Sequence, residues 1–330
     1  MKNVAVVGAT GAVGLEMLDV LYRRHFPVGN IRLLASPKSA GKTLKFGEQE
    51  VVVEELTAQS FSGVDIALFS AGGNISRKFA PIATAAGAVV VDNSSAFRLD
   101  ERVPLVIPQI NPEDVSWHSG IIANPNCTTA ITLMALWPLH KAFGVKRIIA
   151  SSYQAVSGTG AKAILELEHQ VRQTVNGETV CHEVYPHQIA FNVLPHVDSF
   201  LESGHTKEEM KLQSEGRKIM DHAGFRASMT CVRVPVYRAH SVAVHAEFRW
   251  PVSPEAAREV LLGMPGLEVI DNLTANEYPM PLFQVGRDVC AVGRIRRDMA
   301  FGNGLAFWVC GDQLLRGAAL NAVEIAELLL

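Results

Sequence analysis

The first fourteen residues constrain the fold of this chain more than any other segment. Residues 4–7 form a short apolar run, and Gly8, Gly11 and Gly14 follow it at three-residue spacing. A helical pattern begins at once, through Met17, Leu18 and Leu21. A strand, a glycine turn and a helix in this order are typical of a dinucleotide-binding unit, because the glycines permit a tight turn and a close approach of the backbone to a pyrophosphate. The alternative is a tight turn that binds no ligand.

The apolar runs that follow have the spacing of βα units. Residues 31–35, 64–70, 88–92, 103–107 and 120–123 read as strands separated by helical or turn segments. Such runs predict a parallel sheet that is covered on both faces. The second half instead has longer alternating stretches, at 145–155, 230–236, 241–250, 289–296 and 304–309. The sequence therefore predicts an α/β protein with a Rossmann-like N-terminal domain and an α+β domain whose sheet is mainly antiparallel.

Composition excludes several classes of protein. The chain has 330 residues, enough for two domains, and 48% of them are hydrophobic, which argues against intrinsic disorder. Lysine and arginine number 30 against 33 acidic residues, so we expect no nucleic-acid partner. We expect no membrane span, because no apolar run approaches the roughly 20 residues that a bilayer requires. The five cysteines are scattered without a C-x-x-C pair, so we expect no disulfide framework, no metal site and a cytoplasmic location.

The loop after the second strand bears on the choice of cofactor. An enzyme that uses NAD often places a carboxylate there to hold the ribose 2′-hydroxyl. This chain has no carboxylate in the loop, but it has Ser36, Lys38 and Ser39. These groups suit a 2′-phosphate, so the sequence favours NADP. A solvated loop is the alternative.

Cys127 has the setting of a nucleophile. It lies in the segment 124–129, Asn-Pro-Asn-Cys-Thr-Thr, and a helical pattern starts directly after it. The N–H groups and dipole at a helix N-terminus stabilise a thiolate. The alternative, a small buried apolar side chain, suits the other four cysteines well.

Three further residues could serve such a cysteine. His240 is a candidate acid/base and lies seven residues after Arg233, so on a straight strand the two side chains would be on opposite faces and about 23 Å apart. Both can reach one site only if the chain bends within 235–239. Gln154 ends a predicted strand before the small residues 156–161 and could orient a carbonyl or a water.

Together these motifs resemble the aspartate-semialdehyde dehydrogenase family. The similarity runs through residues 8–14, 124–129, 154–158 and 233–240 and covers the whole chain in order, and residues 317–323 are similar to the closing helix of that family. The cysteine turn combined with Gln154-Ala155-Val156-Ser157-Gly158 is specific to the family, whereas the glycine turn is not.

The resemblance implies a role for each of these residues. Cys127 would be the nucleophile, His240 the acid/base, and Gln154 would position the substrate. Substrate binding would fall to the α-carboxylate ligand Arg233, the α-amino ligand Glu208 and the phosphate ligands Lys211 and Arg98. Cofactor binding would involve Gly8, Thr10, Gly11, Ala12, Val13, Gly14, Ser36, Lys38, Ser39, Gly73, Ser157, Gly158 and Gln313.

The implied reaction is the NADP-dependent, reversible reductive dephosphorylation of L-4-aspartyl phosphate to L-aspartate 4-semialdehyde through a cysteine thioester. It serves the biosynthesis of lysine, through diaminopimelate, and of threonine and methionine. The implied organisation is an NADP-binding domain of residues 1–127 and 312–330 and a catalytic and dimerisation domain of residues 128–311, in a homodimer. Two departures weaken the match: Lys38 stands where the family usually has arginine, and Gln313 stands where relatives often have asparagine.

Three other functions compete with that of an aspartate-semialdehyde dehydrogenase. An N-acetyl-gamma-glutamyl-phosphate reductase shares the plan, but its acylated substrate would offer Glu208 no cation. An inactive nucleotide-binding paralogue should have lost a member of the set Cys127, Gln154, Arg233 and His240. A reductase with a Tyr-x-x-x-Lys pair is excluded, because none of the five tyrosines has lysine four residues later. Without the family, Glu208 and Lys211 would read as a surface pair, three residues apart on a helix.

Overall fold

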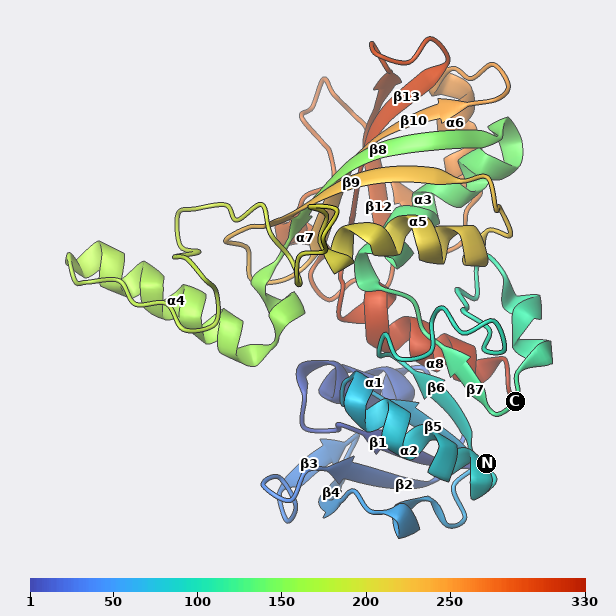
Figure 1. Ribbon diagram of the computed structural model, residues 1–330, viewed down its shortest axis with the longest axis vertical. Helices are drawn as coiled ribbons and strands as arrows, with labels where there is room; N and C mark the ends of the chain where they lie inside the picture. The colour runs from blue at the N-terminus through green and yellow to red at the C-terminus, as the bar shows by residue number, and fades with distance from the viewer. The chain divides into compact units, whose positions relative to one another are not determined.

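The computed structural model describes residues 1–330, which form two compact units (Figure 1). The first unit comprises residues 1–126 and 317–330, and the second comprises residues 127–316. None of the helices is both long enough and apolar enough to pass through a membrane.

A seven-stranded sheet forms the centre of the first unit. Its strand order is β3-β4-β2-β1-β5-β6-β7, and every neighbouring pair is parallel except β3 with β4. The strands are β1 (Lys2–Val7), β2 (Val28–Ala35), β3 (Thr43–Phe46), β4 (Gln49–Glu55), β5 (Ile66–Phe69), β6 (Val89–Asp92) and β7 (Ile121–Ala123). The helices are α1 (Ala12–Arg23), α2 (Gly73–Ala85) and α8 (Leu320–Glu327), with 3₁₀ turns η1 (Ala58–Phe61) and η2 (Pro112–Trp117).

Helices cover both faces of this sheet. The connection through α1 moves from β1 to β2, and the connection through α2 moves the opposite way along the sheet, from β5 to β6. Because such crossovers are right-handed, α1 and α2 lie on opposite faces. The apolar runs that predicted strands are buried, as all four residues of β5 are. The predicted Rossmann-like domain is confirmed.

One predicted strand is wrong. Residues 103–107 are buried, but only Leu105 makes a single parallel bridge, to Ala123. Pro104 and Pro108 have no N–H to give to a ladder, so this apolar run is buried without joining the sheet.

The second unit has a six-stranded sheet in the order β11-β12-β13-β10-β8-β9. The three inner pairs are antiparallel and the two outer pairs are parallel, so the predicted mainly antiparallel sheet is confirmed. The strands are β8 (Val145–Gln154), β9 (Arg226–Arg233), β10 (His240–Phe248), β11 (Leu267–Val269), β12 (Cys290–Arg297) and β13 (Gly304–Gly311). The helices are α3 (Cys127–Phe143), α4 (Ala161–Asn176), α5 (Lys207–Ile219), α6 (Pro254–Leu262) and α7 (Pro281–Gln284), with a 3₁₀ turn η3 (Val156–Thr159).

Helices α3 and α5 pack against one face of this sheet (Figure 1). A capping box begins α5, because Thr206 accepts from the Glu209 amide and Glu209 accepts from the Thr206 amide. Residues 317–323, which the sequence likens to a closing helix, begin in a π-helical turn, η4 (Leu315–Ala319), and continue into α8.

Candidate active site

The strand order brings Gln154, Arg233 and His240 together at the ends of three adjacent strands of the second sheet. Strand β8 lies between β9 and β10, and Arg233 pairs with Gln154 in the β8–β9 ladder. Ser241 pairs with Tyr153 on the other side, so His240 begins β10 beside the end of β8. The three side chains therefore come from the corresponding level of three adjacent strands.

The bend that the spacing of Arg233 and His240 requires is present. The chain leaves β9 at Arg233, crosses the end of β8 and enters β10 at His240, with Ala239 in the left-handed region at φ 72°. A Cβ atom added to Gly158 would lie 2.9 Å from Nη1 of Arg233 and 3.3 Å from Nε2 of His240. Gly158 thus marks the point where the two side chains meet, and a hydrogen at residue 158 is what lets them do so.

The His240 ring is buried and held through one nitrogen. The Ala155 amide donates to Nδ1 over 3.0 Å, whereas Nε2 is buried and has no partner. A ring nitrogen that accepts a hydrogen bond carries no proton, so neutral His240 has its proton on Nε2. Burial, and then the positive charge of Arg233, hold the pKa of His240 well below its ordinary value of 6.5. The ring therefore presents an N–H donor that nothing in the chain accepts.

The Arg233 guanidinium is braced on two sides. Its Nη1 donates to the Ala155 carbonyl over 2.7 Å, and its Cζ lies 5.9 Å from the ring centroid of Tyr185. The Tyr185 hydroxyl lies 3.0 Å from Oγ1 of Thr159, which anchors the ring to η3. The Nε atom of Arg233 is buried without a partner. A buried guanidinium with an unused donor is suited to bind a carboxylate.

A chain of hydrogen bonds fixes the Gln154 amide. The Ser152 hydroxyl donates to its Oε1 over 3.1 Å, and its Nε2 donates to Oε1 of Glu208 over 3.1 Å. Lys211 donates to the other oxygen of Glu208 over 2.7 Å and to Asp198 over 3.0 Å. The orientation of the amide is therefore set from both ends.

Glu208 and Lys211 form an ion pair, but not the exposed one that a surface helix would give. The Glu208 side chain is only 7% exposed, and it also accepts from Gln154. Burial alone would lower the pKa of the Lys211 ammonium, yet the carboxylates of Glu208 and Asp198 raise it above its ordinary value. Burial acts against the Asp198 carboxylate as well, but the Ser199 amide and Lys211 lower its pKa.

Cys127 is the first residue of α3, as the sequence predicts, and it is partly exposed. Its Sγ lies 3.9 Å from the Thr128 hydroxyl. Three other cysteines are buried, and burial raises the pKa of each thiol to about 12 (Cys231, Cys290 and Cys310). Those thiols are poor nucleophiles, because the thiolate is the reactive form.

Gln313 acts as a brace within the second unit. Its Oε1 accepts from the Ala239 amide over 2.8 Å, and its Nε2 donates to the Ser157 hydroxyl. The amide thereby ties η3, which holds Ser157 and Gly158, to the turn that precedes His240. Both ends of the Gln313 side chain are engaged in the chain itself.

The glycine turn in the first unit fits a dinucleotide. Gly8 has φ 85°, and a Cβ there would lie 2.6 Å from the Ser70 carbonyl oxygen; a Cβ on Gly14 would lie 2.3 Å from the Gly8 oxygen. Gly11 is the N-cap of α1. A cavity of about 510 Å³ lies along the turn, lined by Gly8, Thr10, Gly11, Ala35, Ser36, Pro37, Glu55, Leu56, Ser70, Ala71, Ile75, Lys78 and Phe79. The backbone cradle and the cavity are what an adenine nucleotide requires.

Only some of the predicted cofactor residues line this cavity. Gly8, Thr10, Gly11 and Ser36 do. The predicted residues of the first unit that are absent from its walls are Ala12, Val13, Gly14, Lys38, Ser39 and Gly73, and Ser157, Gly158 and Gln313 belong to the second unit. Thr10 and Ser39 remain linked, with their hydroxyl oxygens 3.5 Å apart.

Arg98, the predicted phosphate ligand in the first unit, is buried among backbone carbonyls. Its Nε donates to the Asn124 oxygen over 2.8 Å and its Nη2 donates to the Asn93 oxygen over 2.9 Å. The guanidinium therefore holds together the chain segments that follow β6 and β7.

Four residues of these sites are not predicted from the sequence. Ser152 carries a usable signal, because it lies two residues before Gln154 and so shares its face of the strand. Glu55 and Lys78 line the cofactor cavity from β4 and α2, and Tyr185 packs on Arg233 from a loop. No local pattern links these three to their sites, since only the tertiary fold brings them there.

Two family models and a curated relative match this chain. Residues 3–118 match the model for the semialdehyde dehydrogenase NAD binding domain, and residues 136–316 match that for the semialdehyde dehydrogenase dimerisation domain. An aspartate-semialdehyde dehydrogenase of Aquifex aeolicus is 52% identical over 99% of this chain and 97% of its own length.

Two solved structures are similar over the whole chain. Aspartate semialdehyde dehydrogenase II from Vibrio cholerae, complexed with ASA, is 44% identical with a TM-score of 0.97, over 100% of this chain and 98% of its own. Aspartate semialdehyde dehydrogenase with NADP from Candida albicans is 26% identical with a TM-score of 0.79, over 100% of this chain and 98% of its own.

Proposed function

The chain belongs to the aspartate-semialdehyde dehydrogenase family, and from this premise we propose that it converts L-4-aspartyl phosphate reversibly to L-aspartate 4-semialdehyde with NADPH, through a thioester on Cys127. The reaction would serve lysine, threonine and methionine biosynthesis. One observation carries the proposal most directly. Nε of Arg233 and Nε2 of His240 are buried donors without partners, and they lie at the same strand ends as the Gln154 amide, which is hydrogen-bonded on both sides.

The charges of the proposed substrate have complements in the chain. Arg233 would bind the α-carboxylate, and Glu208 would bind the α-ammonium group. Lys211 and Arg98 would bind the phosphate. Glu208 is paired with Lys211 in the structure. In this proposal the substrate ammonium replaces Lys211 on that carboxylate, which leaves the lysine free to bind the phosphate.

In the first half-reaction the Cys127 thiolate would attack the acyl carbon, form the C–S bond and expel phosphate. Gln154 would orient the acyl group. The Nε2 proton of His240 would donate to the oxygen that gains negative charge as the carbonyl carbon becomes tetrahedral. The hydrogen bond from Ala155 keeps that proton on Nε2. In the reverse direction His240 would hold the aldehyde oxygen in the same way.

The nicotinamide cofactor would supply the hydride that reduces the thioester to the aldehyde. Gly8, Gly11 and Gly14, with Thr10, Ala12, Val13 and Ser36, would hold its pyrophosphate and ribose at the start of α1. Lys38 and Ser39 would favour the 2′-phosphate of NADP, and Gly73, Ser157, Gly158 and Gln313 complete the proposed set. The NADP named for the Candida albicans relative supports this choice. Glu55 in the cavity wall acts against it, because a carboxylate repels a phosphate.

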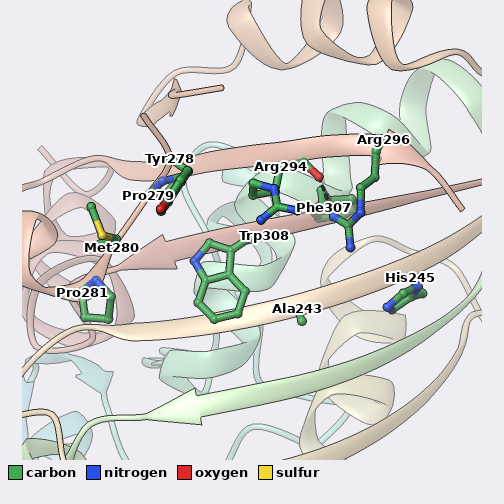
Figure 2. A pocket seen from close by; sticks show the side chains of 10 residues that line it. All are labelled: Ala243, His245, Tyr278, Pro279, Met280, Pro281, Arg294, Arg296, Phe307 and Trp308. Atoms are coloured by element: carbon green, nitrogen blue, oxygen red, sulfur yellow. Dashed lines mark hydrogen bonds between the residues drawn. The ribbon is translucent and has the colours of Figure 1, made fainter. Parts of the chain in front are cut away.

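We further propose a homodimer that forms through the open face of the six-stranded sheet. This face carries Ile149, which is 52% exposed, and Tyr153, which is 37% exposed and packs on Trp308 with ring centroids 5.1 Å apart. Figure 2 shows Trp308 at the centre of a pocket of about 290 Å³ in this face, with Arg294 and Arg296 along one side. Arginine substitution at Ile149 should give a monomer in light scattering, whereas the same change at Leu165 on α4 should leave the dimer intact.

An assay of the purified chain with aspartate semialdehyde and phosphate, in the presence of NADP or of NAD, tests the proposed activity. We expect robust turnover that requires phosphate and is faster with NADP. A parallel assay with the acetylated glutamate analogue separates the proposal from the reductase alternative. Activity only on the acetylated substrate would overturn the assignment.

A further inference from the structure

A cluster of histidine and cationic side chains lies at the opposite end of β8 from Gln154. A pocket of about 350 Å³ is lined by His140, Lys141, Gly144, Val145, His222, Arg249 and Trp250. Val145 and Gln154 are the two ends of the ten-residue strand β8, so the pocket is about 30 Å from the site described above. Nothing in the proposed reaction uses these residues.

The backbone of a single residue, Val145, contacts two histidines in this pocket. The Val145 amide donates to Nδ1 of His140 over 3.2 Å, and Nε2 of His222 lies 3.0 Å from the Val145 carbonyl oxygen, to which it donates. The two rings stack with centroids 4.7 Å apart and an interplanar angle of 27°. One nitrogen of each ring is left for another partner, the Nε2–H donor of His140 and the Nδ1 atom of His222.

The permanent charges of the pocket have no counter-ion in the chain. Lys141 and Arg249 belong to no ion pair, and instead lie over indole rings, Lys141 Nζ 5.4 Å from the Trp137 centroid and Arg249 Cζ 5.9 Å from that of Trp250. No carboxylate lines the pocket. Burial first, and then His222, Lys141 and Arg249, lower the pKa of His140. These three groups come from the turn after α5, from α3 and from the residue that follows β10.

One wall of the pocket is an aromatic ring that packs on the backbone. Gly144 has φ 66°, and a Cβ there would lie 2.9 Å from the Trp250 ring. The absence of a side chain at residue 144 therefore lets Trp250 lie directly on the backbone as an aromatic wall beside the cations.

We propose that this pocket is a binding site for a phosphate-type oxyanion, with Lys141 and Arg249 as cations and the Nε2–H group of His140 as a hydrogen-bond donor. The oxyanion pairs with charges that the chain leaves unpaired, and charge-assisted hydrogen bonds of this kind are the strongest available to it. The volume and the Trp250 wall also leave room for an organic group on the phosphate.

The test is a titration of the full-length protein, followed through the ring NMR signals of its histidines. Inorganic phosphate should shift the His140 and His222 ring signals saturably. The double substitution Lys141→Gln and Arg249→Gln removes the fixed charges from exposed positions, and it should weaken the response about tenfold or more. Equal shifts with sodium chloride at the same ionic strength, or an unchanged response in the double variant, would overturn the proposal.

Two further arms complete the design. Adenosine monophosphate in place of phosphate distinguishes an organic phosphate, which should bind more tightly if Trp250 stacks on its base, from free phosphate alone. The His240 signal reports on the active site in the same spectra. Shifts at His140 and His222 without a shift at His240 support the distal site even if the proposed reaction fails, and a shift at His240 alone contradicts it.

Discussion

The Ala155 amide donates to Nδ1 of His240 across 85 residues of sequence, over 3.0 Å. Because this bond assigns the ring proton to Nε2, the histidine faces the site as a donor. A base for the Cys127 thiol would need a free lone pair at Nε2, so the geometry favours His240 as the proton donor to the acyl oxygen.

The first prediction concerns pH and His240. Its folded-state pKa lies below the ordinary 6.5, so between the two values the unfolded chain binds the extra proton. The stability of the native chain should therefore fall as the pH drops below about 6.5, by at most about 1.4 kcal/mol per pH unit from this group. Urea unfolding at several pH values should give a free energy of unfolding that depends less steeply on pH in His240→Gln than in the wild type. His140, whose pKa is also lowered, contributes with the same sign and serves as a second variant for comparison.

The second prediction concerns the nucleophile. Cys127→Ser should reduce turnover by a factor on the order of 10³ or more, because a hydroxyl at this position has no comparable anionic form near neutral pH. NADPH binding, followed by fluorescence, should survive. Cys181→Ser, which changes an exposed thiol, should leave turnover unchanged. Retention of a tenth of the wild-type rate by the Cys127 variant would rule out the thioester.

The third prediction concerns Ser152 as a positioning residue. Removal of its hydroxyl in Ser152→Ala leaves Oε1 of Gln154 without a donor and frees the amide to flip. We expect kcat to fall about two- to tenfold with little change in KM, in line with the usual value of one hydrogen bond. Ser151 faces the other side of β8, so Ser151→Ala is the matched control. Equal kcat values for the two variants would remove Ser152 from the mechanism.

The fourth prediction concerns Gly158. A methyl group there would press on the Arg233 guanidinium and the His240 ring. Gly158→Ala should lower kcat/KM by about tenfold or more, since a small displacement of positioning groups is costly. Gly302 has open space around its Cβ position, and Gly302→Ala should be neutral. A fully active Gly158 variant would mean that the two side chains do not act together.

The fifth prediction concerns cofactor choice. Lys38→Glu should lower the NADP-to-NAD ratio of kcat/KM, whereas Lys42→Glu, farther along the same loop, should not. Glu55→Gln should raise that ratio on the order of threefold, because it removes a negative charge from the cavity wall. If only Glu55 responds, the 2′-phosphate is read by the cavity wall and not by the loop that the sequence suggests.

The sequence predicts those parts of the site that depend on local chemistry. A cysteine at a helix start and a strand that ends at Gln154 follow from short patterns, and both are present. The pairing of β4 with β2, which brings Glu55 next to Ala35, depends on strand order and cannot be read from either segment alone. Residues 103–107 are wrongly predicted as a strand for a related reason. An apolar run indicates burial, but Pro104 and the following Pro108 prevent this segment from pairing in the sheet.

The central position of β8 has a consequence for how the enzyme acquires its activity during folding. Gln154 meets Arg233 and His240 only after β9 and β10, which follow it by some 80 residues, have both closed onto β8. Such long-range closures are slow steps in folding. A nascent or partly folded chain therefore carries Cys127, the proposed nucleophile, without the residues proposed to act with it, and on the proposed function chemical competence arrives together with the completed sheet.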